Sequence, residues 1–524
     1  MLARSVPAVV DPHELRNRSS SAQETALTIA LAAASVAFAP LLNALSPALA
    51  VGTEVLVACA IIAAVPGYAP SIAIFILLFQ NLFVSIFSSY IADPSELAFV
   101  KGYNFLICAV MWLATFVLYA LNRRDRSPEI NRLMIGSTVV LGVVVLYFLK
   151  GLPQNGVGAS IYLRNIALPI FLFQLALVTA ATYEVRLTPI LVAIGVMLVI
   201  CGYVELFFRN FWLDITNGYS YWHLEAVKAI DSGVWEREMR ETGEVFVTLK
   251  DHFRFSFFNT PLLDGLGLST MLRIFGPDIS AISFAYSVGF FALFLFSVGR
   301  PLLGFAALPL AVFCGVKGAA ILVLFVGASW IATRLIGAVA TLALGFIALV
   351  AYAIAGLYIG RRIGDYHVLG FLGGWYGFLQ EPLGRGLGIG GNLSGHFSAI
   401  DWQAAQRSGS VQGAVESAVG VLLYQMGVAA VLPLGFYFMI AMKSWRLYAS
   451  SGLLTQGLAA FGIFAVLTNG FFQEEALFGP PALGFLACLA GLVIGNAVRV
   501  NSRVRVAQPP PQRDLGRAVL APSR

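Results

Sequence analysis

Uninterrupted apolar stretches of roughly 17–25 residues recur along nearly the whole chain, and they limit what it can fold into more than any other feature. Each stretch is long enough to cross the hydrocarbon core of a bilayer as a helix. The chain is 59% hydrophobic and only 11% charged, and a soluble fold of this composition would expose large apolar patches to water. We therefore expect an all-α, polytopic integral membrane protein.

The apolar stretches predict about fourteen transmembrane helices. Residues 1–24 form a short tail before the membrane domain of residues 25–498. Residues 499–524 form a basic tail, which we expect to be disordered and to lie against anionic lipid. The predicted spans are 25–44, 48–66, 69–90, 102–121, 133–149, 165–182, 188–207, 279–298, 301–315, 318–334, 335–358, 418–442, 455–472 and 479–497.

Lysine and arginine in the short connections predict the orientation of these spans, because cytoplasmic loops carry the excess of positive charge. With the N-terminus inside, the cytoplasmic connections hold Arg123, Arg124, Arg126, Arg132, Arg186, Arg300, Arg334, Lys443 and Arg446, whereas the external ones hold only Lys101, Lys150, Arg164 and Lys317. Both termini are therefore expected in the cytoplasm. The net charge of +6 reflects this topology and does not indicate nucleic-acid binding.

Two long loops, about 208–278 and about 359–417, fall on the external side in this topology, and the second carries the densest set of candidate site residues. Arg361 and Arg362 end a span there, and guanidinium groups match phosphate oxygens bidentately. Snorkelling to the interface is the alternative. The glycine-rich run 384–390 could bring backbone N–H groups to a phosphate, or could form a flexible turn.

The order of motifs in this region resembles the signature of the O-antigen ligase and polymerase superfamily, which contains Wzy-type polymerases and WaaL-type ligases. The resemblance is carried by Arg361 or Arg362, the segment Pro382–Gly388, the pair Glu416–Ser417 that opens an apolar helix, and Gln425–Met426–Gly427. Two more segments agree with it: Arg254–Pro261 and Gly315–Ala319 are similar to motifs of these proteins. The resemblance extends over roughly residues 165–475.

Three departures from the family pattern are visible. Glu416–Ser417 stands where ligases usually have a His-Asn pair, Lys317 replaces the usual arginine, and Ser256 stands where glycine is expected. The first departure favours a polymerase over a ligase.

The resemblance implies glycosyl transfer from an undecaprenyl-diphosphate-linked oligosaccharide at the outer face of the bacterial inner membrane. It also implies that membrane lipid surrounds the protein and that a chain-length regulator and a flippase are candidate partners. It implies no cofactor. A metal site is not predicted, because the sequence has no Asp-x-Asp pair and no His/Cys cluster at ligand spacing. No P-loop is found either, which argues against ATP-driven transport.

Such a reaction needs cations for the departing diphosphate and a group that deprotonates the acceptor hydroxyl. Glu416, at a helix N-terminus whose dipole keeps it ionised, is the first candidate base, although a simple N-terminal helix charge is the alternative. His396 is the second candidate base, and a solvated loop histidine is its alternative. Glu474 and Glu475 are either solvated or paired with loop arginines. The candidate diphosphate-binding residues are Arg361, Arg362, Lys317, Arg254, Arg164 and Arg385.

Two other functions remain open from the sequence. A ligase would use the same lipid-linked donor but transfer the glycan to a lipid or protein acceptor. A flippase or another secondary transporter is a rival from a different class, although transporters usually place ionisable groups near the bilayer midplane and carry an internal repeat.

Overall fold

The computed structural model describes residues 22–184, 186–231, 236, 253–255, 271–394 and 400–507. Within these residues, eleven helices are long and apolar enough to cross a membrane. They lie on eleven of the predicted stretches, and the other three stretches form the shorter apolar helices α13, α14 and α21. Because nearly all of the long elements are helices of this kind, the chain is an all-α, polytopic membrane protein.

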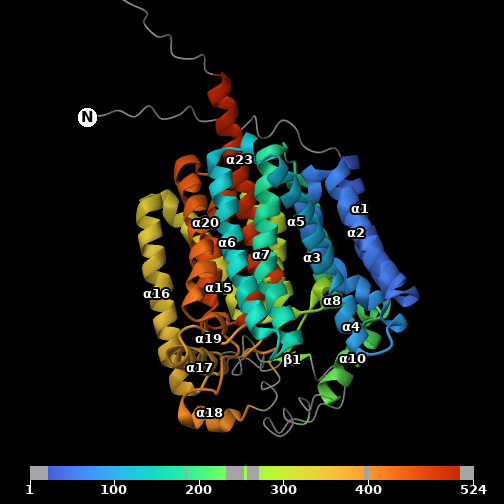
Figure 1. The fold of residues 1–524 in the computed structure, drawn as a ribbon, viewed down its shortest axis with the longest axis vertical. Coiled ribbons are helices and arrows are strands. Elements are labelled where there is room, and N and C mark those ends of the chain that lie inside the picture. Colours follow the sequence, from blue (N-terminus) through green and yellow to red (C-terminus); the bar gives the residue numbers. More distant parts are fainter. Residues whose placement is uncertain are drawn as a thin grey trace, which may run out of the picture.

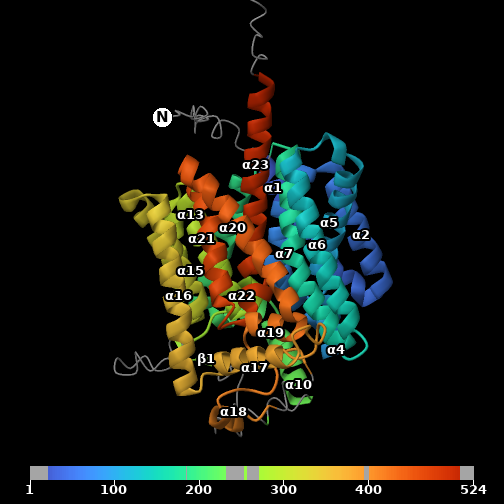
Figure 2. The same cartoon turned by 60° about the vertical axis from the view of Figure 1, so that its left-hand side comes forward.

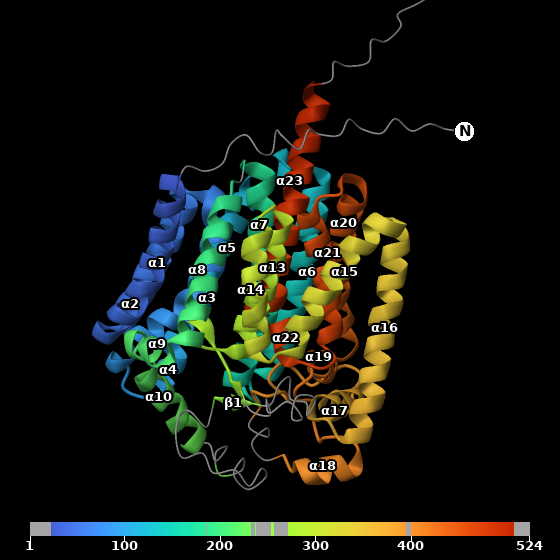
Figure 3. The ribbon, with the colours of Figure 1, turned by 180° about the vertical axis from the view of Figure 1, so that it is seen from behind.

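The long helices run side by side, with α7 in the middle and with α16 and the α1–α2 hairpin at opposite edges (Figures 1 and 3). Their bounds are α1 (Ala22–Leu45), α2 (Pro47–Ala64), α3 (Ala69–Ile86), α5 (Tyr103–Leu121), α6 (Pro128–Gly151), α7 (Gly156–Thr182), α8 (Thr188–Phe207), α13 (Ala281–Ser297), α14 (Pro301–Cys314), α15 (Lys317–Ile336), α16 (Ala338–Ile363), α20 (Val431–Ser451), α21 (Leu454–Asn469) and α23 (Phe485–Ala507).

The short elements gather mainly at one end of this bundle, whereas α1 begins and α23 ends at the other (Figures 1 and 2). They are α4 (Pro94–Val100), α9 (Arg209–Ile215), α10 (Gly218–Asp231), α17 (Tyr366–Gln380), α18 (Trp402–Ser408), α19 (Ala418–Met426), α22 (Glu474–Phe478), the paired strands β1 (Arg254–Phe255) and β2 (Met271–Leu272), and the single turns η1 (Pro66–Tyr68), η2 (Ser88–Tyr90), η3 (Arg123–Asp125), η6 (Gly276–Asp278), η8 (Gly427–Ala430) and η9 (Pro480–Gly484). We call the end of the bundle at which α4, α10, α17 and α18 lie the loop end.

Three boundaries differ from the sequence prediction. The regions 208–278 and 359–417 contain α9, α10, α17 and α18 in place of continuous loop. Helix α7 begins at Gly156, so Arg164 lies within a helix and not at its edge. Helix α23 continues to Ala507, so the first part of the tail predicted to be disordered is helical. Arg499 helps to continue this helix, because its Nε donates to the Ala180 carbonyl of α7 at 3.2 Å.

The α7–α23 pair forms the buried centre of the bundle, and small residues allow its close approach. A Cβ atom added at Gly491 would lie 2.5 Å from the Phe173 carbonyl oxygen, and one added at Gly495 would lie 2.6 Å from that of Leu177. The two glycines are four residues apart and therefore lie on the same face of α23. This packing fixes the frame from which the loop-end elements extend.

Changing both Gly491 and Gly495 to alanine is expected to lower the stability of the protein by about 1–3 kcal/mol, because the added methyl groups must push α7 and α23 apart. Thermal unfolding of the detergent-solubilised protein, followed by tryptophan fluorescence, measures the change. Gly435→Ala in α20 is the control, since nothing lies within 4 Å of the Cβ that it adds. Equal melting temperatures for the double variant and the control would contradict this account of the packing.

Candidate functional site

Four ionisable side chains from three separate segments meet at the loop end: His367, Glu416, Glu474 and Glu475. His367 lies in the first turn of α17, Glu416 lies just before α19, and the two other glutamates begin α22. The His367 Nδ1 atom is 3.5 Å from the Glu416 Oε2 atom. Both Glu416 and His367 are close enough to Glu475 to change its pKa. We call these four residues the acid cluster.

Glu416 is held in a conformation that few residues adopt. Its φ angle is +59°, in the left-handed region that is uncommon for residues other than glycine. Its backbone N–H donates to the Asn392 Oδ1 atom at 2.8 Å. The next residue, Ser417, caps α19 by accepting from the Gly420 N–H. The surrounding structure therefore fixes the backbone of Glu416, as is common at functional sites.

Glu474 is buried beneath the other acids. Its carboxylate accepts from the Tyr162 hydroxyl at 2.5 Å and from the Asn392 N–H at 3.3 Å. Burial raises the pKa of Glu474 to about 8, despite these two hydrogen bonds. Burial also raises the pKa of Glu475, and the nearby Glu416 carboxylate adds to this effect. Glu474 therefore mostly holds its proton at neutral pH.

Two cations belong to the surroundings of the acid cluster. Lys317 is the exposed first residue of α15, and its neighbour Gly318 packs so closely on Gln473 that an added Cβ would lie 2.7 Å from the Gln473 Oε1 atom. Arg273 donates from Nε to the Cys314 carbonyl at 2.9 Å, and its charge lowers the pKa of Glu475. Arg273 is not among the cations predicted from the sequence, although its place six residues before a predicted span could have indicated it.

The other predicted cations are placed differently. Arg361 and Arg362 are exposed at the end of α16, and the Arg362 guanidinium lies 4.3 Å from the Tyr358 ring centroid. Arg164 is half-buried in α7 and donates to the Asn165 side chain at 3.2 Å. Arg254 lies in β1, but its side chain is outside the described residues, and so is all of His396.

Arg385 is already engaged with its own surroundings. Its guanidinium lies 4.1 Å from the Tyr424 ring centroid, its Nη1 donates to the Gly377 carbonyl at 2.9 Å, and its Nε is 3.3 Å from the Glu381 carboxylate. These contacts use two of its five N–H donors and one face of the guanidinium. The structure therefore gives Arg385 a packing role and does not bring it to the acid cluster.

The glycine-rich run packs tightly against its neighbours. We call residues Gly384–Gly391 the glycine strap. The Gly386 N–H donates to the Gln425 carbonyl at 2.9 Å, the Leu387 N–H to that of Tyr147 at 2.9 Å, and the Gly391 N–H to that of Ala414 at 2.5 Å. These N–H groups are therefore not free for a phosphate, and the strap is not a loose turn. The interpretation that the run offers free N–H groups to a phosphate is therefore wrong for Gly386 and Leu387.

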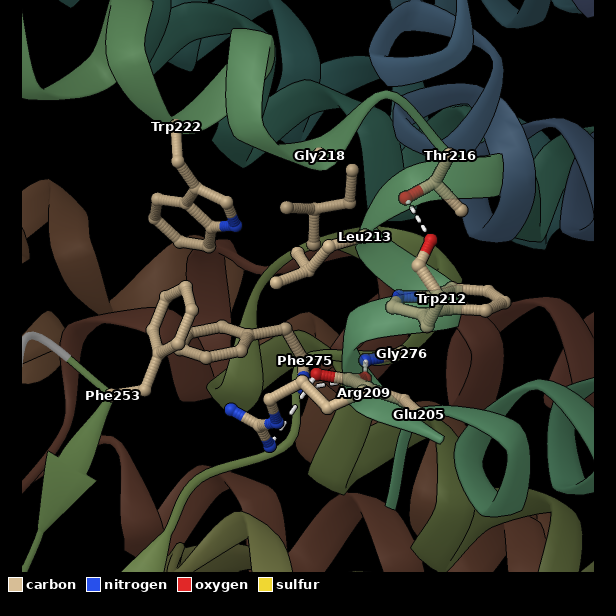
Figure 4. A pocket seen from close by; sticks show the side chains of 11 residues that line it. Glu205, Arg209, Trp212, Leu213, Thr216, Gly218, Trp222, Phe253, Phe275 and Gly276 are labelled. Atoms are coloured by element: carbon tan, nitrogen blue, oxygen red, sulfur yellow. Dashed lines mark hydrogen bonds and ion pairs between the residues drawn. The ribbon is translucent and has the colours of Figure 1, made fainter. Parts of the chain in front are cut away.

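A small pocket lies at the loop end, among the end of α8, the helices α9 and α10, and the residues just before α13 (Figure 4). Glu205 at the end of α8 accepts from the Phe275 and Gly276 N–H groups at 3.0 and 2.6 Å, and Arg209 Nη2 donates to the Arg273 carbonyl at 2.5 Å. The Arg209 Nη1 atom is buried with no hydrogen-bond partner among the described residues. The pocket walls include Trp212, Trp222, Phe253 and Phe275.

At the loop end, one histidine and three glutamates therefore lie close together, with Lys317 and Arg273 nearby. In the part of the chain that the structure describes, no three His, Cys, Asp or Glu side chains come together in a way that could hold a metal ion. No protein-family model matches the chain, and a search of curated proteins finds no match.

Proposed function

We propose that this protein is a polysaccharide polymerase, a membrane glycosyltransferase that joins undecaprenyl-diphosphate-linked repeat units at the outer face of the bacterial inner membrane. The observation that carries the proposal is the acid cluster, with Lys317 and Arg273 beside it, at one end of an otherwise apolar bundle. In this proposal the chain crosses the membrane about fourteen times with both termini in the cytoplasm. The loop end then faces outward.

The proposed reaction needs no metal or cofactor. The oxygen of an acceptor hydroxyl bonds to the anomeric carbon of the donor glycan, the bond from that carbon to the diphosphate oxygen breaks, and undecaprenyl diphosphate leaves with the electron pair. Lys317, Arg361 and Arg362 are the exposed cations that can neutralise the leaving group, because they lie where apolar helices end. The acid cluster receives the proton of the hydroxyl.

A deletion strain tests this function against its rivals. Loss of long glycan chains, with single lipid-linked repeats accumulating on the outer face of the membrane, is the result expected for a polymerase. Long chains that are made but not attached to their anchor would identify a ligase instead. Repeats that stay on the inner face would identify a flippase. Unchanged polymer and unchanged intermediates would overturn the proposal.

The double variant Arg361→Ala/Arg362→Ala is expected to shorten the polymer and to lower the yield of long chains about tenfold or more, because the leaving diphosphate loses two neutralising charges. Gel analysis of the polymer, together with the amount of protein in the membrane fraction, measures the effect. Arg407→Ala is the matched control, since Arg407 is an exposed arginine in α18 at the same end. Wild-type polymer from the double variant would exclude the arginine pair from the site.

A further inference from the structure

We infer that His367 is the general base of the site and that Glu416 is the residue that positions it. The inference rests on the proposed function and assigns the proton transfer within it. The sequence placed His367 in a long loop without a role, and it favoured Glu416 as the base. The geometry around the imidazole reverses these roles.

The backbone of His367 is fixed at the start of α17. Asp365 is the N-cap of this helix, and its carboxylate accepts from the His367 N–H at 3.0 Å and from the Val368 N–H at 3.3 Å. Helix α17 is in turn anchored against the segment before α19, because a Cβ added at Gly370 would lie 1.9 Å from the Val415 carbonyl oxygen. The imidazole therefore projects from a rigid position.

The contacts of Nδ1 determine the tautomer of the neutral ring. Nδ1 lies 3.3 Å from the Glu416 backbone carbonyl oxygen and 3.5 Å from the Glu416 Oε2 atom. A backbone carbonyl can only accept, so Nδ1 must carry the proton. The Nε2 atom is then left with a free lone pair. No hydrogen bond to Nε2 is found among the described residues, and the side chain is 42% exposed, so a substrate hydroxyl can reach it.

Several charged groups lie around His367. Glu416 contacts it directly, and Glu475 of α22 lies close enough to respond to its charge. Asp365 caps the helix that carries His367, and the charge of Arg273 acts on Glu475. Glu474, which mostly holds its own proton, adds little charge at neutral pH.

Nε2 of His367 takes the proton of the acceptor hydroxyl while that oxygen bonds to the anomeric carbon. The electron pair of the breaking carbon–oxygen bond leaves with the diphosphate. The imidazolium then returns its proton to water. Glu416 keeps its charge throughout, as the orienting carboxylate does in other nucleophile–histidine–acid arrangements.

Three variants separate the two roles through the yield of long polymer in cells. His367→Gln is expected to lower the yield about 100-fold or more, because the base is lost. Glu416→Gln keeps an acceptor oxygen but cannot accept a proton, so we expect only about a tenfold loss. Glu416→Gly suits the left-handed backbone but removes the side-chain acceptor, so it should be worse than glutamine. His223→Gln, at an exposed histidine of α10, is the control.

Nitrogen-15 NMR of the full-length, histidine-labelled protein in nanodiscs tests the positioning role without any assay of activity. The chain has five histidines, so the His367 signal is assigned by its loss in His367→Gln. We expect the Nδ1–H form in the wild type. In Glu416→Gly the backbone carbonyl at position 416 remains but the side-chain acceptor is lost, so we expect a smaller share of the Nδ1–H form. An Nε2–H form in the wild type would overturn the inference.

The cellular results can also overturn it. Equal losses from Glu416→Gln and His367→Gln would make Glu416 the base, and wild-type polymer from His367→Gln would remove His367 from the reaction. If deletion of the whole protein leaves the polymer unchanged, the proposed function falls together with this inference. If deletion abolishes the polymer but His367→Gln does not, this inference alone fails.

Discussion

Replacing Gly391 by alanine is expected to leave little folded protein, with a loss of stability of several kcal/mol. A Cβ at this position would lie 1.8 Å from the Tyr162 hydroxyl oxygen. That hydroxyl is buried and donates to Glu474, so the ring cannot move without leaving a buried carboxyl group poorly paired. The φ angle of Gly391 is +88°, which adds about 1–2 kcal/mol of backbone strain for any other residue.

Gly413→Ala provides a matched control for this effect. Gly413 has a φ of +94°, but nothing lies within 4 Å of the Cβ that alanine would add. It therefore carries the backbone strain without the collision, and it should lose only about 1–2 kcal/mol. Thermal unfolding in detergent and the yield of monodisperse protein distinguish the two variants. Equal losses would mean that the contact between the glycine strap and Tyr162 contributes nothing.

The sequence predicts the membrane-spanning part of this fold well, because each long helix is encoded by a continuous apolar stretch. Helix α17, in contrast, is not predicted from the sequence. Gly370, Gly373 and Gly374 lower its intrinsic helix propensity, so the sequence favours a loop there. In the structure these glycines allow backbone contact with the segment around α19, where Cβ atoms would lie within 2.4 Å of carbonyl oxygens. Tertiary packing, which a local pattern does not encode, makes the helix.

The sequence likewise predicts only part of the candidate site. The sequence places Glu416 at a helix start, because the change from polar to apolar residues is local. It does not identify His367 as a partner, since the two residues are 49 positions apart and belong to different helices. The Tyr162–Glu474 bond joins residues 312 positions apart. For Arg385 the sequence predicts a diphosphate-binding role that the structure does not support. A cation in a loop gives no sign in the sequence of its contacts with Tyr424 and Glu381.

The stability of the protein is expected to fall as the pH rises from about 5 to about 8, and Glu474 is one cause. Burial raises the pKa of Glu474 from 4.5 to about 8, so the folded state binds its proton more tightly than the unfolded state does. This contribution is complete below the unfolded pKa and is lost as the pH rises through the folded one. The loss by pH 8 is on the order of 4 kcal/mol.

Glu474→Gln should make this dependence less steep, because the amide cannot ionise and its oxygen can still accept from Tyr162. We expect the variant to be more stable than the wild type at pH 8 and no more stable at pH 4.5. Melting temperatures between pH 4.5 and pH 9 measure the difference. Glu129→Gln is the control, since Glu129 is exposed in an ion pair with Lys443 and should leave the slope unchanged. A wild-type slope in Glu474→Gln would show that the buried carboxyl group is already ionised, and a negative charge next to Tyr162 would then have to be neutralised by a cation.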